Sequence, residues 1–243
     1  MQSPIEIELA GLRRRMHEAH TAVHPEKNPV AKSLASLSAE KLQYLLGQYS
    51  LFPARIVSFL YSARDTARGA GWESVAAELT RNIGEELGTE SGGTSHYEML
   101  LHGIAELAGE ALYEEFRSLE ASPATEAFLS RVESAVGSTD MAHAAGATYA
   151  LESSAVPELV IVRDILSRFL VLATNRTIEG TLKTFFDMHL GTWEPGHEQG
   201  LHASIPNYLP ESDIPAFHKG FEEIMDAMDE WWGELNAEAR TLI

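Results

Sequence analysis

Apolar residues recur every three or four positions along most of the chain, which is the period of an amphipathic α-helix. Leu42, Leu46 and Tyr49 show this spacing, and it resumes after Pro53, a residue type that breaks or kinks a helix. The predicted helices cover residues 4–20, 38–60 with a break at Pro53, 72–87, 95–104, 124–136, 139–154, 156–173, 178–192 and 212–235. No run alternates strictly between apolar and polar positions, so no sheet is predicted. The pattern therefore predicts an all-α bundle of about seven to nine helices.

The size and composition of the chain fit one domain. Its 243 residues are 44% apolar, which is enough to bury a substantial core. The formal net charge of -18 disfavours binding to nucleic acid or to an anionic membrane surface, because both carry negative charge. We therefore interpret residues 1–243 as a single domain with no nucleic-acid partner.

The absence of cysteine and of a long apolar segment narrows the chemistry and the location. Without cysteine the chain has no disulfide, no thiolate ligand and no cysteine nucleophile. The longest apolar region, 156–173, is interrupted by charged side chains such as Glu158 and Asp164, and the N-terminal residues lack the apolar core of a signal peptide. We predict no membrane association and a cytoplasmic location.

A short segment near residue 190 has the density of ligands expected of a metal site. Two imidazoles, His189 and His197, and the carboxylate of Glu194 follow the aromatic pair Phe185 and Phe186. Imidazole and carboxylate ligands without thiolates suit iron, manganese or zinc. We take iron as the working hypothesis.

Two other regions offer groups that could complete such a site. Glu86 ends a predicted helix, and His96 begins the next one after a glycine-rich turn. Glu152 follows a stretch of small and apolar residues, where a carboxylate without a partner would be costly to bury. Because the turn is long, Glu85 or Glu90 could replace Glu86 as the ligand.

Taken together, these residues resemble the haem-oxygenase-like diiron oxidases, which share a fold with thiaminase II and pyrroloquinoline-quinone synthase. That family has a glutamate followed by a histidine, a second glutamate on a middle helix, and a late His-x3-Asp/Glu-x2-His segment. The matching positions here are Glu86, His96, Glu152, His189, Glu194 and His197. The resemblance implies a haem-oxygenase-like bundle that holds two Fe(II) ions and uses dioxygen as a co-substrate.

The late segment departs from the family pattern by one residue. Glu194 lies five residues after His189 rather than four, while Glu194 and His197 keep an i, i+3 relation. On an ideal helix the eight residues from His189 to His197 leave the two side chains about 80° out of line. One extra residue accommodated as a π-bulge would restore their common facing.

The resemblance also implies the kind of reaction. It implies an oxidase or oxygenase that attacks a C–H bond of a small carboxylate substrate, most plausibly a free amino acid. Desaturation, hydroxylation, cyclisation, C–C cleavage and N-oxygenation all occur in the family. Arg163 and Arg176, near the predicted metal segment, are candidates to bind the substrate carboxylate in a bidentate manner. Trp231 and Trp232 near the C-terminus indicate either docking of the last helix or a subunit contact, and the second would allow a homodimer.

Three alternatives stay open at this point. The first is a fatty-acid oxidative decarboxylase of the same family, with a long apolar tunnel. The second is a metal-free oxidase or a haem binder that uses His20 or His24. The third is a non-enzymatic binding module on the same fold. The thiaminase reaction is disfavoured, because its nucleophile is a cysteine.

Overall fold

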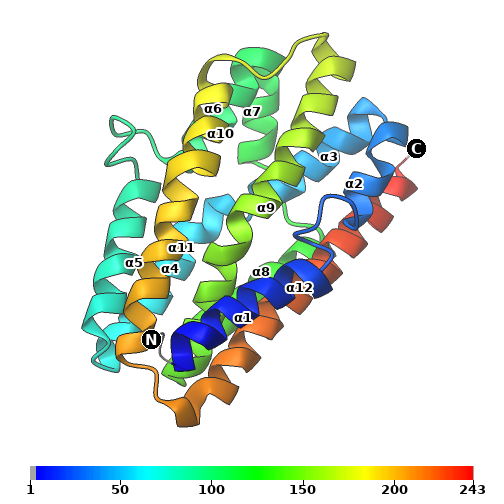
Figure 1. Ribbon diagram of the computed structural model, residues 1–243. Coiled ribbons are helices and arrows are strands. Elements are labelled where there is room, and N and C mark those ends of the chain that lie inside the picture. Colours follow the sequence, from blue (N-terminus) through cyan, green and yellow to red (C-terminus); the bar gives the residue numbers. More distant parts are fainter. Residues whose placement is uncertain (1–3, 243) are drawn as a thin grey trace.

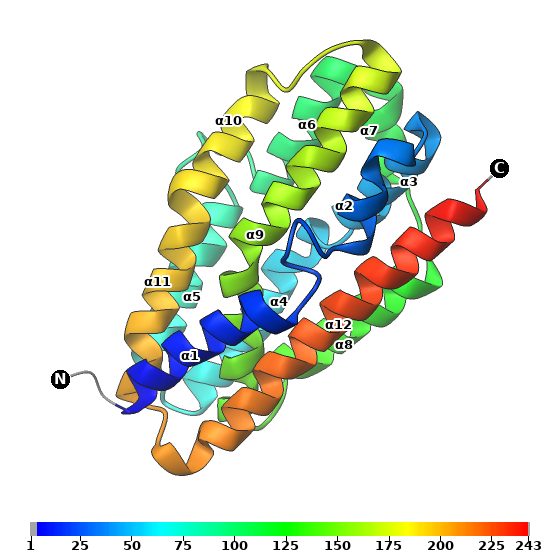
Figure 2. The ribbon, with the colours of Figure 1, turned by 45° about the vertical axis from the view of Figure 1, so that its right-hand side comes forward.

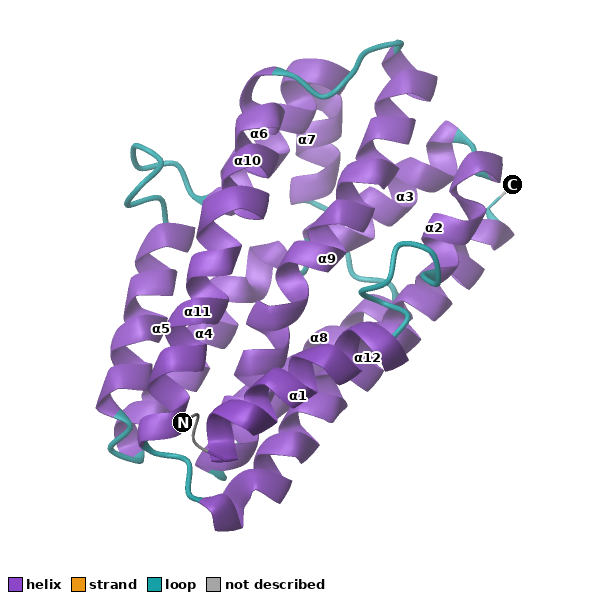
Figure 3. Ribbon diagram, in the orientation of Figure 1, coloured by secondary structure: helices purple, strands orange, loops and turns teal. Residues whose placement is uncertain are grey.

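The computed structural model describes residues 4–242, and this part of the chain is helical with no strand (Figures 1 and 3). The α-helices are α1 Pro4–Ala19, α2 Pro29–Ser33, α3 Ala39–Ser50, α4 Pro53–Gly69, α5 Glu73–Glu86, α6 His96–Ala108, α7 Glu110–Arg117, α8 Pro123–Val136, α9 Met141–Thr174, α10 Gly180–Met188, α11 Glu194–Ser204 and α12 Ile214–Thr241. A π-helix, η2 (His189–Trp193), joins α10 to α11. Short 3-10 turns are η1 Leu34–Ser36, η3 Ile205–Asn207 and η4 Glu211–Asp213. The all-α prediction is confirmed.

The division into helices differs from the prediction in several places. The described residues contain twelve α-helices instead of seven to nine, partly because the short helices α2 and α7 were not predicted. The two helices predicted over 139–154 and 156–173 are one continuous helix, α9, which runs through Pro157. Proline ordinarily disfavours a helix interior. Here neighbouring helices pack along both halves of α9, and this tertiary packing keeps it continuous.

Several helix starts follow from local capping. The Ser95 side chain accepts a hydrogen bond from the Glu98 amide at the start of α6, as the sequence indicated. Asp140 accepts hydrogen bonds from two amides at the start of α9. Pro53 is the first residue of α4, so the predicted break in residues 38–60 is confirmed.

Helix α9 is the centre of the bundle. It contacts α3, α4, α8, α11 and α12, and it runs through the middle of the molecule between α10–α11 and α12 (Figures 1 and 2). Where α9 crosses α12, a Cβ added at Gly146 would lie 1.9 Å from the Phe217 carbonyl oxygen. A Cβ at Gly220 would lie 2.0 Å from the His143 carbonyl oxygen. The two backbones therefore pack so closely that only glycine fits at these positions.

Helix α12 docks through its two tryptophans. Trp231 and Trp232 are 1% and 0% exposed, and Trp231 stacks on Phe128 of α8 with ring centroids 4.2 Å apart. The Tyr49 ring of α3 also stacks against both tryptophans. This aromatic cluster belongs to the core, so these tryptophans are not available for a subunit contact.

The described helices include none that is both long enough and apolar enough to cross a lipid bilayer.

Candidate metal centre

A cavity in the bundle brings together all six residues that the sequence singled out. Side chains from α3, α4, α9 and the α10–α11 segment line it, together with the end of α5 and the start of α6. Its empty volume, including the part open to solvent, is about 670 Å³. Its acidic and imidazole lining is Glu86, His96, Glu152, Glu158, His189, Glu194 and His197. The rest of the lining is apolar apart from the Tyr49 hydroxyl.

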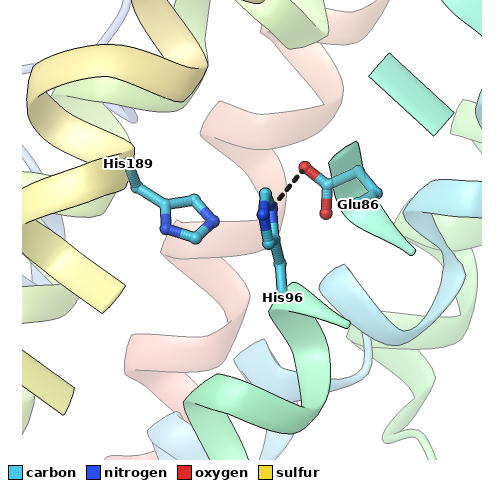
Figure 4. Close-up of side chains that lie close together, drawn as sticks. All are labelled: Glu86, His96 and His189. Atoms are coloured by element: carbon cyan, nitrogen blue, oxygen red, sulfur yellow. Dashed lines mark ion pairs between the residues drawn. The ribbon is translucent and has the colours of Figure 1, made fainter. Parts of the chain in front are cut away.

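The first group of potential ligands consists of Glu86, His96 and His189. All three are buried, and each offers a ligand atom within 4.8 Å of the others. Glu86 Oε1 lies 3.1 Å from His96 Nδ1, and the His96 and His189 rings are 4.4 Å apart between centroids. Figure 4 shows His96 between the other two side chains. We call this group the imidazole triad.

The second group consists of Glu86, Glu194 and His197, again buried and with ligand atoms within 4.8 Å of one another. His197 Nδ1 lies 3.5 Å from Glu194 Oε2 and 3.4 Å from Glu152 Oε2. Asn82 Nδ2 donates a hydrogen bond of 3.3 Å to the other oxygen of Glu152. We call Glu86, Glu194 and His197 the carboxylate triad. Glu86 belongs to both triads.

A tight turn after α5 brings His96 back beside Glu86. Gly88 has φ 98°, and a Cβ there would lie 2.5 Å from the Thr94 carbonyl oxygen. Only glycine combines this φ with such a close approach to the backbone. The long spacing between Glu86 and His96 is therefore taken up by a loop that folds back on itself.

The π-helix η2 sets the register of the late ligands. It spans His189 to Trp193, at the place where the sequence has one residue more than the family pattern. The π-bulge prediction is confirmed, because His189, Glu194 and His197 all line the same cavity. Aromatic rings pack around the imidazoles: Phe185 lies 3.9 Å from His189 and Trp193 lies 4.0 Å from His96, between ring centroids.

The imidazole triad is arranged to present unprotonated nitrogens. His189 Nδ1 donates a 2.7 Å hydrogen bond to the Phe185 carbonyl oxygen, which leaves the Nε2 lone pair toward the cavity. Burial, with the neighbouring His96, lowers the pKa of His189 to about 3. Both ring nitrogens of His96 are buried without a hydrogen bond, since the 3.1 Å approach of Glu86 lacks hydrogen-bond geometry.

The carboxylate triad has the opposite electrostatics. Burial alone would lower the pKa of His197, but Glu152, Glu194 and Glu85 outweigh it and raise this pKa well above the usual range. Burial, with the charges of Glu86 and Glu152, raises the pKa of Glu194. Without a metal, a protonated His197 therefore neutralises part of this acidic group.

Neither Glu85 nor Glu90 occupies the position that the two triads share. Glu85 Oε2 lies 2.9 Å from His197 Nε2, on the side of the ring away from Glu152, and its other oxygen accepts a 2.6 Å hydrogen bond from Arg81. Glu90 is exposed on the turn between α5 and α6. The structure thus gives Glu86 the central position, and Glu85 orients His197 from behind.

The model of the family described as "Domain of Unknown Function with solved-structure structure (DUF3865)" matches residues 8–238. The chain belongs to the DUF3865 family. Two crystal structures of a CADD-like protein of unknown function from Nostoc punctiforme PCC 73102 are similar to it. One has 35% identity and a TM-score of 0.89, covering 98% of this chain and 99% of that one. The other has 32% identity and a TM-score of 0.88, covering 99% of each chain. No curated protein matches the sequence.

In this DUF3865 chain neither of the two arginines predicted to bind substrate lines the cavity that holds the triads. Arg163 is 3.7 Å from Asp164, and Arg176 donates to the Glu106 carbonyl oxygen and to Glu179. Arg163 is eleven residues after Glu152, which places it about 16 Å further along α9. The sequence does not show this distance along the helix axis, because it does not show how the helices pack together.

The haem-binding alternative finds no support at His20. Its Nδ1 lies 2.9 Å from Asp229 and its Nε2 3.0 Å from Glu222, so both ring nitrogens are engaged. His20 and His24 lie at and beyond the end of α1, and neither lines the cavity.

Sequence analysis missed one cavity residue of this DUF3865 member, Glu158. It is 2% exposed and lines the cavity beside Tyr49 and Leu159. Glu158 interrupts the apolar stretch 156–173, and in the sequence this charge argues only against a membrane span.

Proposed function

We propose that this DUF3865 protein is a haem-oxygenase-like, non-haem diiron enzyme that uses dioxygen to oxidise a small organic substrate. The observation that carries the proposal is the pair of buried triads that share Glu86 and open on one cavity. A carboxylate between two sets of nitrogen and oxygen ligands is suited to bridge two metal ions. Glu152, 3.4 Å from His197, adds a third carboxyl to the mixed ligand set.

The residues fit a metal centre better than they fit a metal-free polar core. The described residues offer His96 no hydrogen bond at either buried nitrogen, and such orphaned groups are rare in folded proteins. His189 is fixed in the tautomer whose Nε2 can bind a metal, and its low pKa keeps it neutral. In this chain without cysteine, the donor set is limited to nitrogen and oxygen, as iron accepts.

Bound iron would supply the electrons that reduce dioxygen next to the substrate. The chain itself would hold the ions through its two triads, with Glu85 and Arg81 fixing the His197 ring. Apolar side chains such as Phe52, Leu100 and Phe185 line the cavity and would exclude water from the reacting carbon.

The residues that line the cavity change the substrate that we expect. A free amino acid held by an arginine is not part of this proposal, because no lysine or arginine lines the cavity. The mostly apolar lining instead favours a substrate with an apolar body, which includes the oxidation of an aliphatic chain as a second candidate reaction.

The test is anaerobic loading with ferrous iron, followed by exposure to oxygen. The wild-type chain should bind two irons, and Glu86→Gln should lose high-affinity binding of both, because Glu86 is common to the two triads. Glu90→Gln, an exposed glutamate four residues away, is the matched control and should bind two. Binding of fewer than two irons by the wild type, or of two by Glu86→Gln, would overturn the proposal.

A further inference from the structure

Glu158 is a buried carboxyl group that neither triad uses. It lies on α9, six residues after Glu152 and therefore about 9 Å further along the helix axis. Its Oε1 accepts a 2.9 Å hydrogen bond from the indole nitrogen of Trp232, which fixes the side chain. Its Oε2 makes no hydrogen bond to any described residue, although the residue is 2% exposed. Because Glu158 lines the cavity, this oxygen can form a hydrogen bond with a molecule bound there.

The free oxygen belongs to a group that lines the same cavity as the two triads. Most of the cavity wall is apolar, with Phe52, Ile56 and Leu159 among its lining residues. The described cavity lining contains no lysine or arginine, so the chain itself supplies no cation to Glu158. A ligand is then the natural source of the missing hydrogen-bond donor.

The charge of the surroundings selects the sign of that ligand. Four carboxyl groups line the cavity, and the whole chain carries a formal charge of -18. Both features attract cations and repel anions. Burial raises the pKa of Glu158 to about 8, and an ammonium group placed beside it would stabilise the ionised carboxylate, which an anion would not.

We propose that the cavity takes an apolar amine, whose ammonium group is bound by Glu158 and whose carbon chain extends toward the two triads. The oxidation of such an amine rests on the proposed function. Its binding by Glu158 does not. Because Glu158 lies about 9 Å along α9 from Glu152, the carbon that reacts would be several bonds away from the nitrogen. The carboxylate substrate expected from the sequence is replaced by one of opposite charge.

The experiment compares three probes of equal chain length on the full-length, metal-free protein: n-hexylamine, n-hexanol and hexanoate. Binding is followed by calorimetry and by tryptophan fluorescence, since Trp232 contacts Glu158. Hexylamine should bind at least about tenfold more tightly than either of the others, as for a hydrogen bond to a charged group. Equal binding of the three, or tightest binding of hexanoate, would overturn the assignment.

The variant Glu158→Gln keeps the size of the side chain and an oxygen for Trp232. It should weaken hexylamine binding about tenfold or more and leave hexanol binding nearly unchanged. The control Glu98→Gln removes a carboxylate that accepts a hydrogen bond from Tyr113 on α7, outside the cavity, and should change neither. Undiminished hexylamine binding in Glu158→Gln would refute the role of Glu158.

A separate readout distinguishes this inference from the proposed function. Ferrous-iron loading is measured on the same samples. Two bound irons without a preference for the amine would refute the substrate class alone. A preference for the amine without iron binding would refute the diiron proposal and leave the amine site standing. If Glu158→Gln does not fold, the comparison of the three probes on the wild type still decides.

Discussion

The two triads share Glu86 and one cavity, yet they solve the problem of burying polar groups in opposite ways. In the imidazole triad burial holds the pKa of His189 low and keeps its ring neutral, and His96 has no hydrogen bond at either nitrogen. In the carboxylate triad His197 is surrounded by Glu85, Glu152 and Glu194, which stabilise its protonated form. The first group therefore presents the neutral His189 ring beside Glu86, and in the second a protonated imidazole offsets part of the carboxylate charge.

This difference explains how the metal-free protein can bury several carboxylates in one site. A cluster of carboxylates buried together without a cation would be severely destabilising. A protonated His197 supplies that cation until metal ions replace it, and metal binding then releases its proton. His189 needs no such substitute, because its neutral ring carries no charge to compensate.

The largest effect should come from breaking the register between the two triads. Deletion of Gly191 removes the extra residue of η2, and a regular helix would then rotate His189 by about 100° relative to Glu194 and His197. We expect loss of one of the two irons, measured by metal analysis after anaerobic loading. The control is Gly191→Ala, since a Cβ there meets no atom within 4 Å. Two irons in the deletion variant would show that the π-helix is not needed.

The next prediction compares how much each triad contributes to the stability of the metal-free protein. In the metal-free protein, His197→Ala leaves buried carboxylates without their counter-charge and should lower the free energy of unfolding by roughly 3–5 kcal/mol at neutral pH. His189→Ala removes a neutral imidazole from the imidazole triad and should cost roughly 1–2 kcal/mol. Denaturant titration of both variants gives the comparison. Equal losses would mean that the two triads do not differ electrostatically.

A smaller effect concerns the residue behind His197. Glu85→Gln keeps a hydrogen-bond acceptor but removes the charge that orients and polarises the imidazole. Changes of this kind in a metal site reduce affinity by about 10–100-fold. Competition with a metal-buffering chelator would measure the change, and only one of the two irons should be affected. An unchanged affinity for both irons would make the contact purely structural.

The last effect is a pH dependence at Glu158, outside both triads. The folded protein holds this proton up to a pKa of about 8, while an unfolded glutamate releases it near 4.5. Between these values the unfolded state binds fewer protons, so the wild type loses stability as the pH rises. The melting temperature of metal-free Glu158→Gln should therefore rise relative to the wild type between about pH 5 and 8. A constant difference across this range would contradict the raised pKa.

Local physics let the sequence predict much of this molecule. The helical period placed most of the helices, Pro53 marked the break between α3 and α4, and Ser95 marked the start of α6. The one-residue excess between His189 and Glu194 indicated the π-helix. These features depend on residues within one or two turns of each other, so the sequence contains them directly.

The tertiary structure alone decided the rest. Helix α9 stays continuous through Pro157, with buried residues on both sides of the proline packed against other helices. Glu85 and Glu86 are adjacent in the chain, and only the position of His197 on another helix gives them different roles. Arg163 is remote from the cavity and Glu158 lines it, although both interrupt the same apolar stretch. The sequence shows neither how deeply a charged side chain is buried nor which residues it contacts, because both depend on contacts between residues far apart in the chain.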